Sequence, residues 1–295
     1  MKKTFLSLAV LMLLSLVSFT ATAQQEENVV DVRYATFNIR LDAKWDGENN
    51  WKYRKDSVVS FINAQQVDIV GMQEVLPKPL KFLKRHLKKN YAYIGVGRED
   101  GKKKGEHTPI FYNKKKFQLV DNGNFWLSQE PNKAGMIGWD AACPRIVTWG
   151  KFQDKKSGEV FVVFNTHFDH VGAVAQKNSA NLIMDSIKTI AGELPVIMSG
   201  DFNVTDTSQA YQIMTHHPYG LKDTHKIAKQ RTGNTYTFHD FGKRELDKRG
   251  KIDFIFVNKK IDVRSSFIPI EPQQAKKGFL SDHNPVVVQL KLKKQ

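Results

Sequence analysis

The chain alternates short apolar runs with polar stretches, and a few longer segments repeat their apolar residues at helical spacing. Residues 32–39 alternate apolar and polar positions, which predicts a strand. The apolar run at residues 67–72 predicts a buried strand. Residues 77–90 place leucines three and four positions apart on one face and lysines on the other, which predicts an amphipathic helix.

The same patterns continue along the rest of the chain and favour an α/β fold. Further strands are expected at residues 91–96, 109–112, 117–120, 125–127, 146–152, 160–166, 195–199, 252–257 and 286–292. Further helices are expected at residues 53–64, 174–190 and 207–214, and irregular stretches at 97–105 and 222–251. Strands outnumber helices and each long helix follows a strand, which favours a sandwich with packed sheets inside and helices outside.

The first residues have the pattern of a secretory signal peptide. Lys2 and Lys3 precede an apolar run at residues 5–19, and Ala21-Thr22-Ala23 provides small residues for cleavage after Ala23. An uncleaved membrane anchor is the weaker alternative because the apolar run is short. We therefore expect a signal peptide at 1–23, a single catalytic domain at 24–295, and a secreted or periplasmic protein with no integral membrane segment in the mature chain.

Composition narrows the functional classes. The chain has 295 residues, 41% apolar and 25% charged, which is typical of a globular protein. A single cysteine, Cys143, excludes an intrachain disulfide framework and a cysteine-rich zinc site. The formal net charge is +15, with lysine runs at 102–104 and 114–116 and six Lys or Arg within 77–89. These charges fit either a solvated face or attraction to a polyanion such as nucleic acid or anionic lipid.

Polar residues cluster at the ends of the predicted strands. Four early strands run directly into polar side chains, and two late strands begin with them. In a mixed sheet, strands of opposite direction bring opposite ends to one edge, so we expect these side chains to meet. The set is Asn38, Glu74, His167, Asp201, Asn203, Asp253, Asp282 and His283.

The chemistry of this set indicates a hard divalent cation. Carboxylate and amide oxygens without a thiolate suit Mg²⁺, with Mn²⁺ or Ca²⁺ as alternatives, better than zinc. Histidines beside such an ion suit a substrate that develops negative charge on oxygen, as in phosphoryl transfer. Singly, each residue has an ordinary structural explanation, such as a strand-end turn for Asn38 or a core position for His167. Together, six such signals at six strand ends favour a site.

Six short motifs carry a family resemblance over nearly the whole mature chain. In order they are Thr36-Phe-Asn38, Gln73-Glu74, Asn165-Thr-His167, Gly200-Asp-Phe-Asn203, Ile252-Asp253 and Ser281-Asp-His283. The chain resembles the endonuclease/exonuclease/phosphatase superfamily, which implies a four-layer α/β sandwich of two packed mixed β-sheets flanked by helices. Asp42, Asn50-Trp51, Arg54 and Thr166–His170 resemble a secreted bacterial branch similar to the catalytic domains of deadenylases and nocturnin.

The resemblance also implies roles at the metal and at the attacking water. Glu74 would be the principal metal ligand, with Asn38 and Asp282 completing or supporting the site. Asp201 would activate the attacking water, and Asn203 would orient it or hold the phosphate.

The remaining implied roles concern the phosphate. His283 would contact a phosphate oxygen with its ring oriented by Asp253, and His167 would do so from the other side, paired with Glu106. Because a paired carboxylate raises the pKa of a histidine, both rings are expected to be protonated near neutral pH. Arg145 would contact the phosphate, with a surface ion pair as the alternative.

These expectations describe a secreted Mg²⁺-dependent phosphoesterase that hydrolyses a phosphate ester as a nuclease or phosphodiesterase. The basic charge favours nucleic acid as substrate, whereas Trp45, Trp51 and Trp139 could wall a pocket for a lipid head group or a sugar phosphate. A non-catalytic binding module and a two-carboxylate glycan hydrolase are weaker alternatives, since both leave most of the polar set without a role. The sequence sets no oligomeric state.

Overall fold

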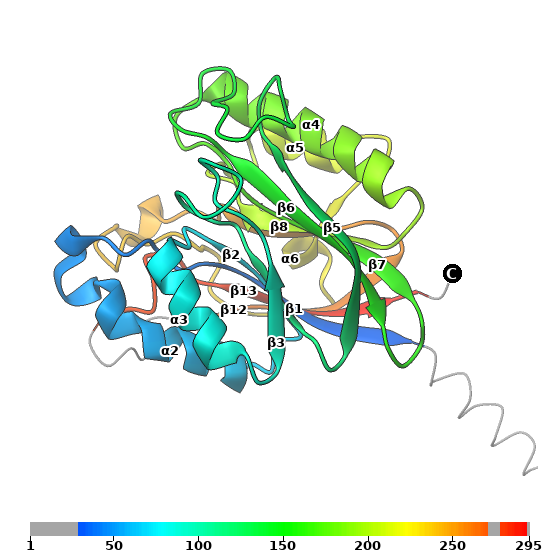
Figure 1. Cartoon of the computed structure of the whole chain (residues 1–295), viewed down its shortest axis with the longest axis horizontal. Helices are drawn as coiled ribbons and strands as arrows, with labels where there is room; N and C mark the ends of the chain where they lie inside the picture. Colours follow the sequence, from blue (N-terminus) through cyan, green and yellow to red (C-terminus); the bar gives the residue numbers. More distant parts are fainter. Residues whose placement is uncertain (1–28, 271–277, 294–295) are drawn as a thin grey trace, which may run out of the picture.

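The computed structural model describes residues 29–270 and 278–293, which form two mixed β-sheets packed face to face with helices on the outside (Figure 1). The predicted signal peptide at 1–23 and the first residues of the predicted mature domain lie outside the described residues. Within the described ranges, no helix combines the length and apolar character that crossing a lipid bilayer requires.

The first sheet has seven strands. β1 lies at its centre, parallel to β2 and antiparallel to β13. In spatial order the strands are β10 (Gln230–Gly233), β12 (Ile261–Ile268), β13 (Val286–Leu292), β1 (Val30–Asn38), β2 (Ile69–Gln73), β4 (Ile110–Asn113) and β3 (Tyr91–Ile94).

The second sheet has six strands. β7 and β8 are parallel, and β11 pairs antiparallel with β8. In spatial order the strands are β5 (Phe117–Trp126), β6 (Ile146–Asp154), β7 (Val160–His167), β8 (Val196–Asp201), β11 (Asp253–Val257) and β9 (Lys222–Asp223).

Helices cover the outer face of each sheet, which gives the four layers that the sequence predicts. α2 (Trp51–Ala64) and α3 (Pro77–Leu87) pack on the seven-stranded sheet, and α4 (Ala173–Ala191) and α5 (Gln209–His216) pack on the six-stranded sheet (Figure 1). The short helices are α6 (Thr224–Ile227), η1 (Lys44–Asn49) and η2 (Leu246–Lys248).

One strand contributes side chains both to the core between the sheets and to the core under the helices, because its side chains alternate. On β1, Val30, Val32 and Tyr34 point between the sheets, whereas Ala35 and Phe37 pack against the helices. Successive side chains of a strand point to opposite faces, so a strand in the middle of a layered sandwich must be apolar on both. The central strands are therefore buried along their length, and their polar ends are held rigidly.

Three sequence expectations differ from the structure. Residues 117–120 and 125–127 belong to one strand, β5, because a bulge between Leu119 and Asp121 lets the pairing with β6 continue. β12 was not expected, although its residues alternate between buried and exposed. The stretch 222–251 is not wholly irregular, since it contains β9, α6, β10 and η2. β10 is a fully exposed edge strand, and so it lacks an apolar pattern.

Candidate active site

The polar strand ends meet at one edge of the two sheets, as their directions require. In the six-stranded sheet His167 lies opposite Asp201, and Asp201 lies opposite Asp253. A cavity of about 490 Å³ opens there. Of the ten residues that the sequence predicts for the site, eight line this cavity: Glu74, Glu106, Arg145, His167, Asp201, Asn203, Asp282 and His283. The other two, Asn38 and Asp253, are fully buried behind it.

Asn38 joins the two sheets at the floor of the cavity. Its Nδ2 donates hydrogen bonds of 2.9 Å to Glu74 Oε1 and 2.9 Å to Asp201 Oδ2. Its Oδ1 accepts from the Arg40 amide, and its backbone carbonyl accepts from Ser281 Oγ at 2.7 Å. Asn38 thus holds carboxylates from both sheets in place without itself lining the cavity.

Of the ten predicted site residues, two sit in the left-handed backbone region. Glu74 has φ 61° and Asn203 has φ 50°. Residues other than glycine rarely adopt this conformation, and when they do they cluster at functional sites. At Asn203 the turn is closed by a 2.9 Å hydrogen bond from its own amide to Asp201 Oδ1. The tight turns re-aim the Glu74 and Asn203 side chains into the cavity directly after β2 and β8.

Asp253 and Asp201 hold His283 between them. Its Nδ1 donates to Asp253 Oδ2 at 2.8 Å, and its Nε2 lies 3.7 Å from Asp201 Oδ2. Burial alone would lower the pKa of His283, but the charges of Asp253 and Asp201 raise it well above its usual value. The ring is therefore an imidazolium at neutral pH, as the sequence predicts for this histidine.

Asp201 is a buried carboxylate with an unusually high pKa. Burial and the nearby Asp253 charge raise its pKa to about 7, against the opposing effects of His283 and the hydrogen bonds that it accepts. A carboxyl group that titrates near neutrality is well matched to proton transfer at physiological pH. Asp201, Asp253 and His283 also have ligand atoms within 4.8 Å of one another. The imidazolium between the two carboxylates accounts for that cluster without an ion.

His167 differs from the expectation. Burial, together with the positive charges of Arg145 and Arg98, lowers its pKa well below its usual value, so the ring is neutral. Asn203 Nδ2 lies 3.0 Å from His167 Nε2, which makes that nitrogen the acceptor and places the proton on Nδ1. The prediction that a carboxylate keeps His167 protonated is wrong.

Glu106 explains why. Its carboxylate accepts two 2.9 Å hydrogen bonds from Arg98, whereas His167 Nδ1 lies 3.8 Å away and makes no hydrogen bond. Arg98 therefore takes the carboxylate that the sequence assigned to His167. Arg98 belongs to the 97–105 stretch, which the sequence predicts to be irregular and in which it indicates no site residue.

Glu74 and Asp282 form an acidic pair whose chemistry fits a hard divalent cation. Burial and the Glu74 charge raise the pKa of Asp282, so a cation beside this pair would favour its ionised form. All the available donors are oxygens, as Mg²⁺, Mn²⁺ and Ca²⁺ prefer. Arg40 Nη1, 3.6 Å from Asp282 Oδ2, partly compensates the pair. The residues present therefore fit such an ion.

Arg145 lines the cavity and forms a buried ion pair with Asp169, not a surface one. The side chain is buried, its Nε lies 3.3 Å from Asp169 Oδ2, and its Nη2 lies 3.0 Å from His170 Nδ1. Its Nη1 is buried and has no hydrogen-bond partner. Because a guanidinium is charged at any physiological pH, Arg145 brings a fixed positive charge to the cavity.

Sequence reasoning missed several cavity residues and misassigned others. Arg40, Arg98, Cys143, His170 and Phe238 line the cavity, and of these Arg40 had the clearest signal because it follows Asn38 by two positions. None of the three tryptophans proposed as pocket walls lines the cavity. Trp51 is buried in the helix-covered core, and Trp45 is 80% exposed.

Comparison with known proteins assigns the family. The family model described as "Endonuclease/Exonuclease/phosphatase family" matches residues 35–283. The chain belongs to this family. Its members act on phosphate ester bonds and are generally dependent on a divalent metal, which agrees with the oxygen-rich cavity.

Solved structures of relatives match nearly the whole chain. An endonuclease/exonuclease/phosphatase from Bacteroides vulgatus is 50% identical, with a TM-score of 0.87 over 90% of this chain and 100% of that chain. A mannosyl-6-phosphatase from Bacteroides thetaiotaomicron is 35% identical, with a TM-score of 0.81 over 88% of this chain and 99% of that chain. The human Nocturnin catalytic domain is 19% identical, with a TM-score of 0.70 over 90% and 97%, and shares the fold.

Proposed function

We propose that this protein is an exported, divalent-metal-dependent phosphoesterase that uses Asp201 as its base and takes a sugar phosphate as its substrate. One observation carries the proposal. Asp201 lies at the cavity floor, hydrogen-bonded to Asn38 and Asn203, with the Nε2 atoms of His167 and His283 at 3.6 and 3.7 Å. A carboxylate with a pKa of about 7 beside an imidazolium can take a proton from water while the imidazolium stabilises negative charge.

The proposed reaction is hydrolysis of a P–O ester bond. Asp201 accepts a proton from the attacking water as its oxygen bonds to phosphorus, and Asn203 orients that water. The protonated ring of His283, held by Asp253, donates a hydrogen bond to a phosphoryl oxygen as charge develops on it. The bond to the alcohol then breaks, and the alcohol leaves with a proton from solvent. His167 is neutral, so it contributes no positive charge to the reaction. Its protonated Nδ1 faces Glu106 Oε2, at 3.8 Å.

Two further groups complete the proposed machinery. Glu74 and Asp282 would hold the divalent ion, with Asn38 supporting Glu74. The ion, when bound, supplies a Lewis acid that polarises the phosphoryl group and stabilises the leaving oxygen. Arg145 would donate from Nη1 to the phosphate.

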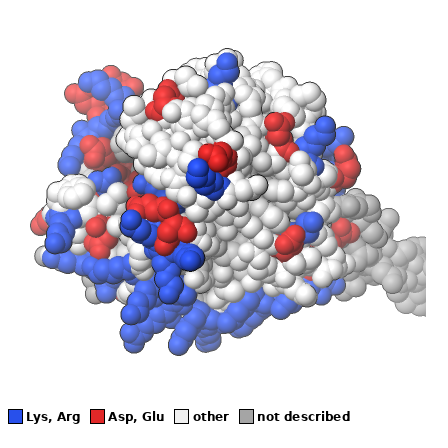
Figure 2. Space-filling model, turned by 45° about the horizontal axis from the view of Figure 1, so that its top comes forward, with Lys and Arg blue, Asp and Glu red and all other residues white. Residues whose placement is uncertain are grey.

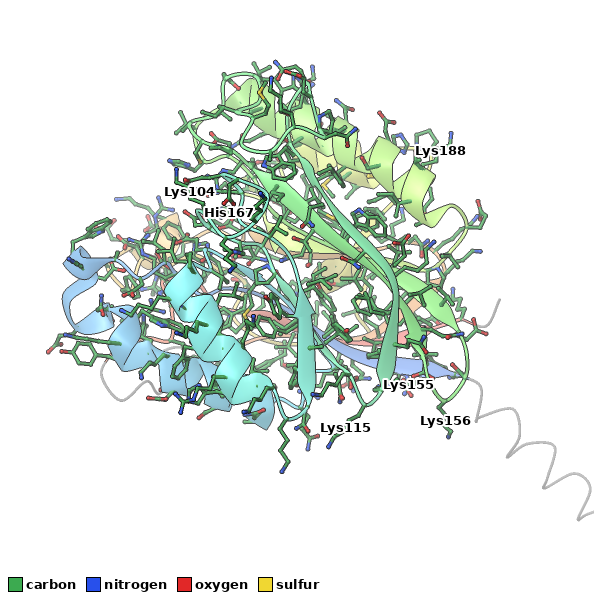
Figure 3. All side chains as sticks on the ribbon, in the orientation of Figure 1. Lys104, Lys115, Lys155, Lys156, His167 and Lys188 are labelled. Carbon is green, nitrogen blue, oxygen red and sulfur yellow. The ribbon has the colours of Figure 1, made fainter. Side chains whose placement is uncertain are left out.

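The substrate class is supported by a relative and by the charge distribution. The relative called a mannosyl-6-phosphatase shares 35% of its residues with this chain over almost its whole length. Lys115, Lys155 and Lys156 lie at the end of the sandwich away from His167, as Figure 3 shows, so these lysines do not extend the cavity into a track for a polymer. A small, highly charged ester fits a cavity of about 490 Å³ with Arg40, Arg98 and Arg145 in its wall.

A substrate panel tests the proposal. The mature chain is assayed with Mg²⁺ on mannose 6-phosphate, p-nitrophenyl phosphate, bis-p-nitrophenyl phosphate and a single-stranded oligonucleotide. We expect release of inorganic phosphate from the sugar phosphate, lost with chelator and in Asp201→Asn. Cleavage of the oligonucleotide without phosphate release from the sugar would overturn the substrate class, and full activity of Asp201→Asn would overturn the base. Export is tested separately by sequencing the N-terminus of the protein recovered from the producing cells.

A further inference from the structure

We propose that a lysine-rich surface on α3 and two neighbouring turns docks this protein on an anionic phospholipid bilayer, leaving the catalytic cavity free. This surface, called here the lysine face, is made of Lys81, Lys84, Arg85, Lys88, Lys89, Lys114, Lys115, Lys155 and Lys156. All nine residues are exposed, and no carboxylate of the described residues lies within 4.0 Å of any of them.

Hydrogen bonds show that the three segments form one surface. Lys114 Nζ donates to the Lys88 carbonyl at 2.7 Å, which joins the end of α3 to the turn after β4. Lys155 Nζ donates to the Lys114 carbonyl at 2.7 Å, which joins that turn to the β6–β7 turn. The space-filling view shows Lys and Arg gathered in a broad band along its lower side, with few acidic side chains among them (Figure 2).

Buried apolar side chains, not pairs of opposite charges, hold α3 in place. Lys81 and Arg85 stand four residues apart within α3, and Lys84 stands four residues before Lys88, the residue that caps the helix. Like charges at this spacing repel, although Lys84 and Arg85 in the last turn also interact favourably with the helix dipole. The helix is instead held by Leu80, Leu83 and Leu87, which are buried in the core. The charges of the lysine face have no carboxylate partner among the described residues, so they remain available to a partner of opposite charge.

The chemistry of the lysine face favours a bilayer surface over a nucleic acid. Eight of the nine residues are lysines, which act as compact point charges, whereas arginine is the residue suited to bidentate recognition of individual phosphates. None of the large apolar side chains that are exposed in the described residues belongs to these segments, so the face offers no stacking platform for bases. Because the apolar side of α3 is buried in the core, attachment would be electrostatic, without insertion into the bilayer.

Two placements are consistent with docking through this face. β7 runs from the turn that carries Lys155 and Lys156 to His167, a length of about 25 Å for its eight residues. Lys115, Lys155 and Lys156 therefore lie at the end of the sandwich away from His167, so a bilayer that contacts these two turns leaves the cavity open (Figure 3). Val29 and Val30, the first described residues of the chain, lie in one depression with Lys115 and Lys155.

Vesicle sedimentation with matched variants tests the proposal. One variant carries Lys81→Gln, Lys88→Gln, Lys115→Gln and Lys156→Gln. Its control carries Lys177→Gln, Lys188→Gln, Lys222→Gln and Lys229→Gln, exposed lysines of other segments, and so loses the same charge. With phosphatidylcholine vesicles containing 30% phosphatidylglycerol in 100 mM salt, we expect at least tenfold weaker binding for the first variant and little change for the control. Binding by the wild-type chain should disappear in 500 mM salt or on pure phosphatidylcholine.

Other results would overturn the proposal. Equal losses in both variants would mean that net charge, not this face, drives binding. No binding to the anionic vesicles, together with binding of a DNA duplex that the first variant loses, would assign the face to a polynucleotide.

Two controls accompany these measurements. Equal melting temperatures of the two variants exclude misfolding as the cause. Asp201→Asn should bind vesicles like the wild type, so docking is tested independently of catalysis.

Discussion

His283 donates a 2.8 Å hydrogen bond from Nδ1 to Oδ2 of Asp253, although the two residues are 30 positions apart in the chain. Asp253 opens β11, and His283 lies just before β13, so the pair spans the two sheets. This contact turns a buried histidine, which burial alone would keep neutral, into a cation that faces the cavity. The pH range in which the enzyme is active should therefore be set partly by this contact.

Replacing Asp253 with asparagine should lower the pKa of His283, because a neutral amide no longer favours the imidazolium. If the protonated ring is the active form, kcat/KM falls about 100-fold or more at pH 8, and the alkaline limb of the pH–rate profile moves to lower pH. The profile of kcat/KM between pH 5 and 10, for wild type and Asp253→Asn, checks this. An alkaline limb that stays in place would show that His283 does not act as a cation.

Asp201→Asn should trade activity for stability. The pKa of Asp201 is raised from 3.8 to about 7, so ionising it opposes folding, with a cost that is absent below pH 4 and grows up to pH 7. The variant should lose roughly 10³-fold in kcat and gain about 1–2 kcal/mol of unfolding free energy at pH 7.5, but gain nothing at pH 4. Urea unfolding at both pH values, in chelator, measures the difference. A variant less stable than wild type at pH 7.5 would contradict the assignment.

Asp169 should stabilise the fold in the opposite pH direction. Despite burial, which raises its pKa, hydrogen bonds from the amides of Gly172, Val171 and Ala142, with the charge of Arg145, lower the pKa to about 2. Its stabilising effect is therefore complete above about pH 4 and is lost as the pH falls toward 2. Asp169→Asn should cost about 1–2 kcal/mol at pH 7 and less at pH 3, by urea unfolding. An equal cost at both pH values would mean that packing, not charge, is lost.

Metal binding should stabilise the protein through the acidic pair. A divalent ion relieves the repulsion between Glu74 and Asp282, and a ligand at about 100 times its dissociation constant adds about 2.7 kcal/mol. In chelator-treated protein, Mg²⁺ should raise the melting temperature by about 5 °C or more. Glu74→Gln should abolish this rise, whereas Glu193→Gln, at an 86% exposed side chain, should keep it. A rise that survives in Glu74→Gln would place the ion elsewhere.

Arg145→Lys should weaken substrate binding more than turnover. Lysine keeps the charge but not the fork that contacts Asp169 and His170 while leaving Nη1 for an anion. We expect KM, and the inhibition constant of inorganic phosphate, to rise about tenfold with a smaller change in kcat. Steady-state kinetics with Arg264→Lys, a surface arginine, as control provide the comparison. An unchanged inhibition constant would show that Arg145 does not contact the phosphate.

The sequence by itself determined the layered fold and which polar strand ends meet at one edge of the sheets. Strand periodicity is local, and the direction of each strand follows from where its polar end lies, so Asn38, Glu74 and Asp201 could be brought together without coordinates. The family match over residues 35–283 agrees with the predicted family.

Tertiary structure alone decided the charge of His167, the partner of Glu106 and the position of the lysine face. Arg98 reaches Glu106, eight positions later, because the stretch between them doubles back, with the Arg98 amide bonded to the Glu106 carbonyl, and no periodicity encodes that turn. His167 is neutral because burial and two arginines outweigh a carboxylate at 3.8 Å. Desolvation and Coulomb energies depend on distances between segments far apart in the chain, and only the folded structure sets those distances.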